Sequence, residues 1–328
     1  MIRLAVIGTN WITQKFVQAA LGTAKFELCA VYSRSLSSAK DFADEFLTAS
    51  NNIHLFDSLD ELAKAENVDA IYIASPNSLH AEQAMLMMDH GKHVICEKPI
   101  ASNIEQALQT VECAERNQVV LFEAYKSEFL PNFKRIKAGL SKIGRLHKAH
   151  LSYCQYSSRY QKYLNGENPN TFNPQFSNGS MMDIGFYCVS AAVALFGKPT
   201  KVQASGVLLD SGVDGHGDAI FSYPEFTVTL SHSKVSDSNQ PSEIQGENGS
   251  IIIDHIAECT KVTIEYRDGK TEDLSVKQAE NSMSYEAEEF ARRIQLKDLT
   301  RDKRALIVSE VTTEMRKQLG VHFPADDK

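Results

Sequence analysis

Short apolar runs alternate with segments of helical periodicity through the first third of the chain. The runs are apolar along their whole length, which is typical of parallel strands covered by helices on both faces. This alternation predicts a doubly wound α/β domain, a Rossmann-type parallel sheet, that is complete by about residue 123. The predicted strands span residues 3–7, 27–33, 70–74, 93–96 and 119–123.

After Pro131 the pattern changes to alternating apolar and polar residues, first at 145–156 and then repeatedly between 200 and 276. Such alternation predicts a mostly antiparallel sheet with helices on one face, and hence an α+β domain. One predicted helix, 180–196, interrupts this pattern. Helices at 284–295 and 302–319 close the chain, with Gly320 as a C-cap.

A chain of 328 residues exceeds what one hydrophobic core usually supports. We therefore expect a dinucleotide-binding domain at 1–123 and an α+β domain for substrate binding and oligomerisation at 124–328. In this division, packing of the C-terminal helix against the first domain stays open.

The chain is acidic, with a formal net charge of −8 and a pI near 5.7. Nucleic acids and anionic membranes bind basic surfaces, so neither is an expected partner. No apolar stretch approaches the roughly 18 residues of a membrane span, and no signal peptide is expected at the start. The six cysteines are scattered without a Cys-x-x-Cys pair, which is typical of reduced thiols and predicts a cytoplasmic protein.

The segment Gly8-Thr9-Asn10-Trp11-Ile12-Thr13 follows the first predicted strand and opens a helix, as a dinucleotide-binding turn does. Only the first glycine of the Gly-x-Gly-x-x-Gly pattern is present. Asn10 tolerates a left-handed backbone, and Thr13 is small enough for close packing of helix on strand. Amides at this helix start would hold a pyrophosphate, which makes residues 8–12 cofactor-binding candidates. An ordinary strand–helix turn without a ligand is the alternative.

The second predicted strand ends in Ser33-Arg34, where an NAD-specific domain carries an acidic residue for the ribose hydroxyls. A hydroxyl and a guanidinium suit a ribose 2′-phosphate instead, so Ser33 and Arg34 favour NADP over NAD as the cofactor. The alternative is that Arg34 is a solvated residue before the next helix.

Glu97-Lys98-Pro99 follows the fourth predicted strand, at the carboxyl end of the sheet where doubly wound folds bind ligands. Ser75-Pro76-Asn77, with His80 close behind, follows the third strand in the same way. Together with the phosphate turn, these motifs closely resemble the glucose-fructose oxidoreductase/inositol dehydrogenase (Gfo/Idh/MocA) family over essentially the whole chain.

The resemblance implies that Lys98 lies near the nicotinamide and the reacting hydroxyl, and that Pro76, Asn77 and Glu97 line the nicotinamide end. Ser75 and His80 are cofactor-binding candidates beside them. A structural role at the helix start stays open for His80, and a surface position before proline is the alternative for Lys98.

The segment Gly179-Ser180-Met181-Met182-Asp183-Ile184-Gly185-Phe186-Tyr187 is similar to the family's Gly-Gly-x-x-x-Asp-x-Gly-x-His/Tyr motif. Asp183 and Tyr187 are four residues apart and share one helix face. Two alternatives stay open, since Ser180-x-x-Asp183 also fits a capping box and Tyr187 also fits a core aromatic.

Tyr187 stands where many inositol-dehydrogenase-like members carry histidine. Resemblance to glucose-fructose oxidoreductase and the dimeric dihydrodiol dehydrogenases implies that Tyr187 is the general acid/base, because a neighbouring lysine cation favours the phenolate. Lys98 would tune the phenol and donate a hydrogen bond, and Asp183 would bind a substrate hydroxyl or orient the lysine. Lys126 and Arg159 are weaker candidates for substrate or nucleotide contacts, and no metal site is assigned.

The leading hypothesis is an NAD(P)-dependent dehydrogenase acting on a sugar, polyol or related cyclic alcohol. Trans-dihydrodiol oxidation and transhydrogenation with a tightly bound cofactor are the enzymatic alternatives, and a non-catalytic nicotinamide-binding sensor is the other. The expected partners are a small-molecule substrate and further copies of the chain. A sheet left open on one face exposes apolar surface, which a dimer or higher homo-oligomer would cover.

Overall fold

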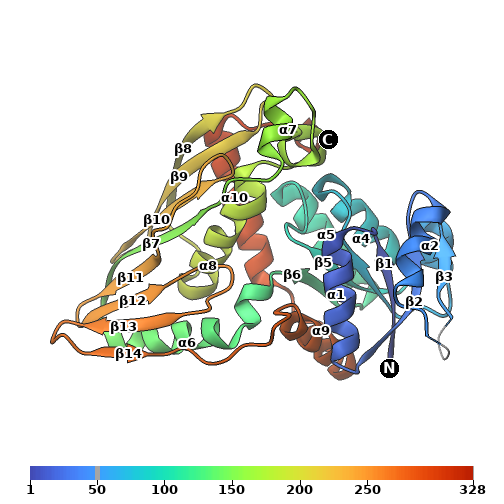
Figure 1. Cartoon of the computed structure of the whole chain (residues 1–328), viewed down its shortest axis with the longest axis horizontal. Helices are drawn as coiled ribbons and strands as arrows, with labels where there is room; N and C mark the ends of the chain where they lie inside the picture. The colour runs from blue at the N-terminus through green and yellow to red at the C-terminus, as the bar shows by residue number, and fades with distance from the viewer. Residues whose placement is uncertain (49–51, 328) are drawn as a thin grey trace. The chain divides into compact units, whose positions relative to one another are not determined.

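The computed structural model describes residues 1–48 and 52–327 (Figure 1). The chain forms two compact units that interleave along the sequence. The first consists of Met1–Ala101, Glu105–Lys126 and Ala279–Lys303, and the second of Ser102–Ile104, Ser127–Gln278 and Arg304–Lys328.

The first unit contains a six-stranded sheet in the order β3-β2-β1-β4-β5-β6, and every neighbouring pair is parallel. The order reverses between β1 and β4, the position where doubly wound folds bind nucleotides. The predicted Rossmann-type sheet is thereby confirmed. Its strands are β1 (Ile2–Ile7), β2 (Phe26–Tyr32), β3 (His54–Phe56), β4 (Ala70–Ile73), β5 (His93–Glu97) and β6 (Leu121–Ala124).

Burial on both faces explains the apolar runs of these strands. All four residues of β4 are buried, and helices lie on both faces of the sheet (Figure 1). The sequence analysis does not predict β3, an edge strand of three residues that are exposed or half-buried. The helices are α1 (Trp11–Gly22), α2 (Leu36–Asp44), α3 (Leu59–Lys64), α4 (His80–Asp89), α5 (Ile104–Asn117) and α9 (Ser284–Leu296).

Helix α9 belongs to the first unit, although the sequence analysis assigns residues 124–328 to the second domain. The difference has a physical reason in the packing of Phe290, which is fully buried. Its ring centroid lies 6.3 Å from that of Phe26 and 5.9 Å from that of Phe122, on strands β2 and β6. The helix that returns to the first unit is therefore α9 rather than the last long helix, α10 (Lys303–Leu319).

The second unit contains an eight-stranded sheet in the order β14-β13-β12-β11-β7-β10-β9-β8. Only β7 and β10 pair in parallel, so the predicted mostly antiparallel sheet is confirmed. The strands are β7 (Leu146–Cys154), β8 (Lys201–Leu208), β9 (Asp214–Ser222), β10 (Thr227–Ser233), β11 (Ser242–Gly246), β12 (Gly249–Ile253), β13 (Val262–Tyr266) and β14 (Thr271–Asp273).

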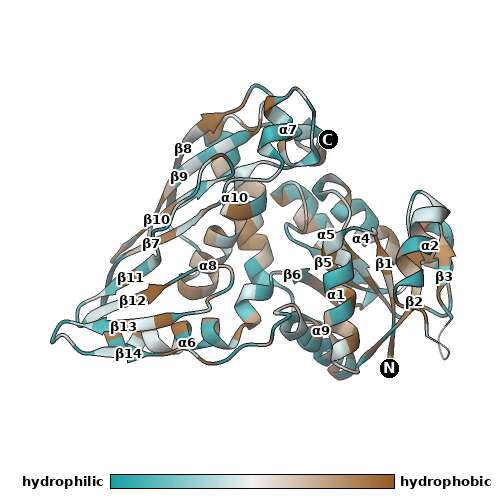
Figure 2. Ribbon diagram, viewed as in Figure 1, coloured by the Kyte–Doolittle hydropathy of each residue, from teal (hydrophilic) through white to brown (hydrophobic). Residues whose placement is uncertain are grey.

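Helices cover one face of this sheet, and Figure 2 shows alternating teal and brown segments along its strands. The α-helices of the unit are α6 (Pro131–Gly139), α7 (Tyr160–Leu164), α8 (Phe186–Phe196) and α10. Among the described residues, no helix of the unit lies on the opposite face (Figure 1). On that side Val207 is 53% exposed and Ile220 is 46% exposed.

One helical stretch corrects the expectation that no segment has the length and apolarity of a membrane span. Residues Pro174–Phe196 meet that description by length and composition. Within this stretch 72% of the qualifying window is buried inside the protein, which is the burial of a core helix.

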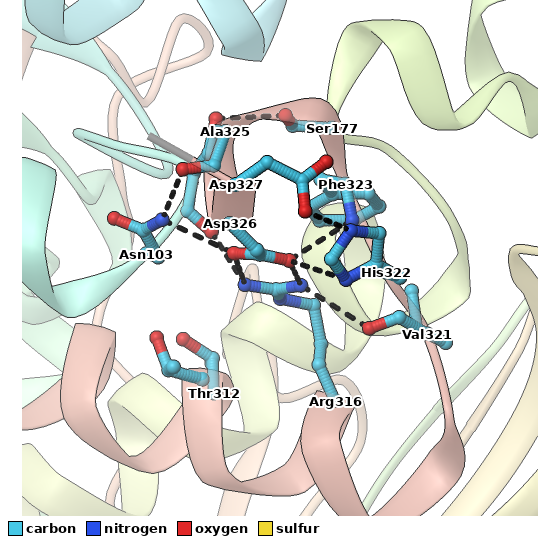
Figure 3. Close-up of polar contacts among 12 residues, drawn as sticks. Asn103, Ser177, Thr312, Arg316, Val321, His322, Phe323, Ala325, Asp326 and Asp327 are labelled. Carbon is cyan, nitrogen blue, oxygen red and sulfur yellow. Dashed lines mark hydrogen bonds and ion pairs between the residues drawn. The ribbon is translucent and has the colours of Figure 1, made fainter.

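A buried arginine ties down the C-terminal segment of the second unit (Figure 3). Arg316, on α10, is 1% exposed and donates to both carboxylate oxygens of Asp326, at 2.8 and 3.1 Å. It also donates to the carbonyl oxygens of Ser102 and Val321, at 3.0 and 3.3 Å. Burial alone would raise the pKa of Asp326, but the hydrogen bonds from Arg316 and the Phe323 amide hold that pKa at about 2.

Candidate active site

The turn after β1 is built around a close approach to the end of β4. Gly8 has a φ of +107°, a conformation that favours glycine. A Cβ at this position would lie 2.9 Å from the carbonyl oxygen of Ala74, closer than side chains tolerate. Glycine therefore lets the turn pack against β4 and leaves bare backbone that a phosphate group can approach. This turn fits a dinucleotide cofactor.

Asn10 shapes the same turn, but not for the predicted reason. Its backbone is extended, with φ −89° and ψ 175°, so tolerance of a left-handed conformation plays no part. The side-chain oxygen instead caps α1 by accepting the amides of Ile12 and Thr13, at 3.0 and 3.1 Å. The side-chain amide donates to the Ala74 carbonyl at 2.9 Å. The Ile12 amide is thus engaged within the protein, and the Gly8 amide donates to the Tyr32 carbonyl at 3.2 Å, which leaves the amides of residues 9–11 as the candidate donors for a phosphate.

Polar and aromatic side chains lie open at the edges of this turn. Trp11, the single tryptophan, is 68% exposed and has the Lys15 ammonium 6.0 Å from its ring centroid. Arg34 lies exposed just beyond β2, next to Ser33, whose amide donates to the Phe56 carbonyl at 3.1 Å. In this fold the adenosine ribose binds beyond the second strand, the region of the chain in which Ser33 and Arg34 lie.

The loop after β4 is linked to the Glu97-Lys98-Pro99 turn by His80. His80 is 1% exposed, and its ring nitrogens lie 2.7 Å from the Pro99 carbonyl oxygen and 2.8 Å from the Ser75 carbonyl oxygen. The Ser75 hydroxyl donates to the side chain of Gln83 at 2.7 Å. The geometry supports the structural role that the sequence left open for His80. Pro76 and Asn77 are half-buried in the loop between them.

A buried tyrosine on the neighbouring strand β4 holds the carboxylate of Glu97. The hydroxyl of Tyr72 donates to the Glu97 carboxylate at 2.6 Å, and the Tyr72 ring stacks on Phe16 of α1 with centroids 3.9 Å apart. Burial raises the pKa of Glu97, while the Tyr72 hydrogen bond and the Lys98 charge oppose that rise. Lys98 itself is half-buried and precedes a cis peptide bond to Pro99. The lysine thus leaves β5 on a turn fixed by its neighbours.

In the second unit, Asp183 and Tyr187 are the two half-buried residues of a segment that is otherwise buried. Every other residue of 179–193, a stretch described in full, is buried. Residues Met181–Gly185 form a single π-helical turn that runs directly into α8. Such turns are frequent at functional sites. Tyr187 is therefore not a core aromatic, and the motif presents an acid and a phenol together.

The capping-box alternative for Ser180 and Asp183 is not supported. Ser180 makes no side-chain cap hydrogen bond, and its hydroxyl lies 2.8 Å from Nδ1 of the buried His232. The Asp183 carboxylate accepts a hydrogen bond from the Lys234 ammonium. Both side chains are therefore committed to strand β10 and its end rather than to the helix start.

A buried carboxylate anchors the start of the same turn. Asp214, on β9, is fully buried and accepts the amide of Met181 at 2.6 Å. Burial raises the pKa of Asp214 to about 6 and lowers that of His232 to about 4. A Cβ on Gly185 would lie 2.9 Å from the His232 ring, which explains why the motif has glycine there.

The Tyr187 ring lies beside two further rings, those of Tyr153 and His255. Its ring centroid is 5.7 Å from that of Tyr153 on β7, in an edge-on arrangement, and Tyr153 is in turn 4.6 Å from His255. Edge-on contacts of this kind fix the plane of a ring. The Tyr187 ring thus packs against a side chain of β7.

The sequence motifs do not predict three polar residues of this region, Lys234, Asp214 and His232. The available signal lay in the alternation of β10, whose inward positions Val228 and Leu230 continue into His232 and Lys234. Polar residues on the core face of a strand need partners, and so point to a site.

Of the weaker candidates, Lys126 lies near enough to Glu97 for its charge to oppose the rise in the pKa of that carboxyl. Lys126 donates to the Ser282 hydroxyl at 3.0 Å within the first unit, and Arg159 is exposed before α7. All six cysteines are free thiols. Within residues 1–48 and 52–327, no group of three His, Cys, Asp or Glu side chains is arranged to hold a metal ion.

Comparison with protein-family models matches both units. A model described as an oxidoreductase family with a NAD-binding Rossmann fold (GFO_IDH_MocA) matches residues 2–125. The model of the GFO/IDH/MocA C-terminal domain matches residues 134–252. The chain belongs to the Gfo/Idh/MocA family of oxidoreductases, which confirms the resemblance drawn from its motifs.

Curated relatives extend over nearly the whole chain. An uncharacterized oxidoreductase of Escherichia coli, YgjR, is 54% identical, with 99% of each chain covered. A Bacillus subtilis protein named scyllo-inositol 2-dehydrogenase (NADP(+)), IolU, is 49% identical, also with 99% of each covered. A trans-1,2-dihydrobenzene-1,2-diol dehydrogenase of Xenopus tropicalis is 28% identical, over 95% of this chain and 96% of that one.

Solved structures share the fold at low sequence identity. KijD10, a 3-ketoreductase from Actinomadura kijaniata solved with NADP and TDP-benzene, has a TM-score of 0.85 at 22% identity, covering 98% of this chain and 99% of that one. An oxidoreductase from Thermotoga maritima has a TM-score of 0.83 at 24% identity, with 99% of each chain covered. These likenesses concern the fold alone.

Proposed function

We propose that this protein is an NADP-dependent dehydrogenase that oxidises a ring hydroxyl of a cyclic polyol or sugar to the ketone, reversibly. The observation that carries the proposal is the pairing of Asp183 and Tyr187 as the open positions of the buried segment 179–193. The Bacillus subtilis relative named scyllo-inositol 2-dehydrogenase (NADP(+)) supports both the substrate class and the cofactor.

We assign the proton transfer to Tyr187. As a phenolate it accepts the proton of the substrate hydroxyl while the C–H bond at the same carbon breaks and the carbonyl forms. A bound nicotinamide supplies the carbon that takes up the hydride. Lys98, as a cation, stabilises the phenolate and donates a hydrogen bond to the reacting oxygen. Asp183 accepts a hydrogen bond from a neighbouring hydroxyl of the substrate and so fixes the ring.

For the cofactor, the proposal assigns the phosphates to the turn of residues 8–12 and the 2′-phosphate to Ser33 and Arg34. The bare backbone at Gly8 and the exposed guanidinium of Arg34 support this assignment. Ser75, Pro76, Asn77 and Glu97 are assigned to the nicotinamide end, with His80 shaping the loops that carry them.

The first experiment measures nicotinamide absorbance with NADP and NAD across inositol isomers, sugars and trans-dihydrodiols. We expect turnover with NADP and a cyclic polyol, and a loss of about 10²-fold or more in Tyr187→Phe and Lys98→Met, the size of a general acid–base contribution. Normal turnover in either variant would refute the assigned roles. Cofactor binding, followed through Trp11 fluorescence, separates a catalytic loss from a failure to bind NADP.

A second candidate substrate is a trans-dihydrodiol, because five relatives of 25% to 29% identity are named trans-1,2-dihydrobenzene-1,2-diol dehydrogenase. Preferential turnover of dihydrodiols in the same panel would favour it. Nucleotide that purifies with the protein and exchanges only through paired substrates would favour the transhydrogenating alternative. Tight NADP binding without turnover of any cyclic alcohol would favour a sensor.

We further propose that the enzyme works in the cytoplasm as a homodimer or higher oligomer joined through the open face of the large sheet. Free thiols at all six cysteines suit a reducing compartment. Exposed apolar residues on that face, among them Val207 and Ile220, suit an interface.

A further inference from the structure

Lys234 is a lysine whose side chain is almost fully buried. It follows directly after β10, and its backbone amide donates to the Gly215 carbonyl at 2.9 Å, so strand pairing fixes its position. Its side chain is 9% exposed, and its ammonium pairs with the carboxylate of Asp183, whose side chain is 31% exposed. A buried ammonium is costly unless it is paired, so this lysine has a strong physical reason to hold the carboxylate.

The ion pair is accompanied by two hydrogen bonds that attach residues 180–183 to the neighbouring strands. Ser180 lies 2.8 Å from His232 on β10, and Met181 donates its amide to Asp214 on β9 at 2.6 Å. Asp183 is held by Lys234 at the end of β10. Three of four consecutive residues are thus attached to β9 and β10, which fixes the turn on the sheet. The tie at Asp183 differs from the others because it joins two charges and its acid is partly open to solvent.

We infer that Lys234 is a positioning residue, which keeps Asp183 ionised and aimed so that it accepts a hydrogen bond from a hydroxyl of the substrate. This inference rests on the proposed function, since it adds a residue to the acid that the proposed reaction uses. Lys234 is not part of the sequence motif around Asp183, because it lies 51 residues further along the chain.

Other charged groups around the pair define what a titration would report. Asp214 and His232 contact the start of the turn, and Tyr187 lies one turn further along the same helix. The charges of Arg316 and of Lys234 itself both lower the pKa of Asp214, while Asp218 and His216 act on His232. Burial holds His232 neutral above pH values near its pKa of about 4. Asp214, with a pKa raised to about 6, is the group whose titration must be told apart from that of Asp183.

The test follows the carboxylates directly and needs no substrate. Protein labelled with ¹³C at aspartate Cγ is titrated, and the Asp183 resonance is identified as the one missing from Asp183→Asn and retained in Asp214→Asn. In Lys234→Met we expect the Asp183 titration midpoint to rise by about one pH unit or more, because a cation within contact distance favours the ionised acid by that amount. Lys234→Arg should restore the midpoint.

The same variants are then assayed for turnover. In Lys234→Met the acid limb of the kcat/KM profile should move upward with the Asp183 midpoint, and KM for the polyol should rise more than the dissociation constant of NADP. The matched control is Lys198→Met, which breaks an exposed ion pair with Glu310 in the same unit and should leave both profiles unchanged.

The outcomes separate the two proposals. An Asp183 midpoint in Lys234→Met equal to that of the wild type overturns the inference, whatever the activity. A wild-type acid limb in an active Lys234→Met enzyme overturns it as well. Normal turnover by Tyr187→Phe would instead overturn the proposed function, while the carboxylate titration still decides whether Lys234 sets the charge of Asp183.

Discussion

At the scale of single residues, buried charges constrain this protein most strongly. Arg316 and Lys234 each lie almost entirely out of solvent, and each is matched by a carboxylate that retains partial access to water. In such pairs, removing the acid leaves an uncompensated buried cation, which costs more than the pair itself contributes. The two pairs differ in place: Arg316 holds the C-terminal segment, whereas Lys234 holds a residue of the candidate site.

We predict that Asp326→Asn lowers the free energy of unfolding by about 3 kcal/mol at neutral pH, because Arg316 loses its counter-charge. The Asp326 pKa of about 2 lies below its ordinary value of 3.8, so its ionised form stabilises the fold fully above about pH 4. That contribution declines as the pH falls toward 2. Denaturant unfolding of both proteins at pH 7 and pH 3 measures it, and an equal difference at the two pH values would contradict the linkage.

A second residue-scale prediction concerns cofactor choice. Arg34→Ala should weaken NADPH binding by about tenfold and leave NADH binding unchanged, since a charge-assisted hydrogen bond to the 2′-phosphate is lost. Quenching of Trp11 fluorescence during titration with each nucleotide gives both affinities. Lys15→Ala is the control: it also removes a cation near Trp11, but one that is not assigned to the 2′-phosphate. An unchanged NADPH to NADH ratio would show that Arg34 is merely solvated.

At the scale of elements, the protein places its helices by side chains that reach across to strands. Asn10 caps α1 and also bonds the end of β4, so one residue sets both where the helix begins and how it meets the sheet. On the second unit, Tyr153 of β7 and His232 of β10 flank the helix of Asp183 and Tyr187 in the same way. The positions of these two helices are therefore set in part by contacts with strands.

We predict that Asn10→Ala lowers the free energy of unfolding of the first unit by about 1 kcal/mol through loss of the cap. Asn10→Ser keeps an oxygen that can accept the helix amides but removes the donor to Ala74, so it should recover most of the stability. Thermal unfolding compares the three proteins. A serine variant no more stable than the alanine variant would show that the bond to β4 matters more than the cap.

At the scale of the whole molecule, the large sheet has one face on which no helix of the second unit lies among the described residues (Figure 1). We predict that sedimentation at micromolar concentration finds a dimer or higher oligomer, and that Ile220→Lys shifts it to monomer because a charge enters an apolar interface. Ile220 is 46% exposed in the chain, so its replacement should not unfold the protein. Leu108→Lys, at a 37% exposed position on α5, is the control. A monomeric wild type would contradict the predicted assembly.

Much of the fold could be predicted because its signals are local. Continuous apolar runs identified five strands of the first sheet, and alternation identified most of the second. The misses were elements with weak local signals. β3 has three residues, and β11, though central, contains Ser242, Glu243 and Gln245, with Ile244 alone supplying apolar burial. Pairing with β7 and β12 forms β11, and no local pattern encodes that pairing.

The candidate site likewise has features that local sequence signals predict and features that only tertiary contacts create. By itself, the sequence determined the two sheet types, the glycine turn, the Glu97-Lys98-Pro99 turn and the helix with Asp183 and Tyr187, because spacing along a strand or helix sets which residues share an edge or a face. Tertiary structure alone decided that α9 returns to the first unit and that Lys234 reaches Asp183. Those contacts join residues far apart in sequence, and they form because buried rings and charges need partners that only the packed chain supplies.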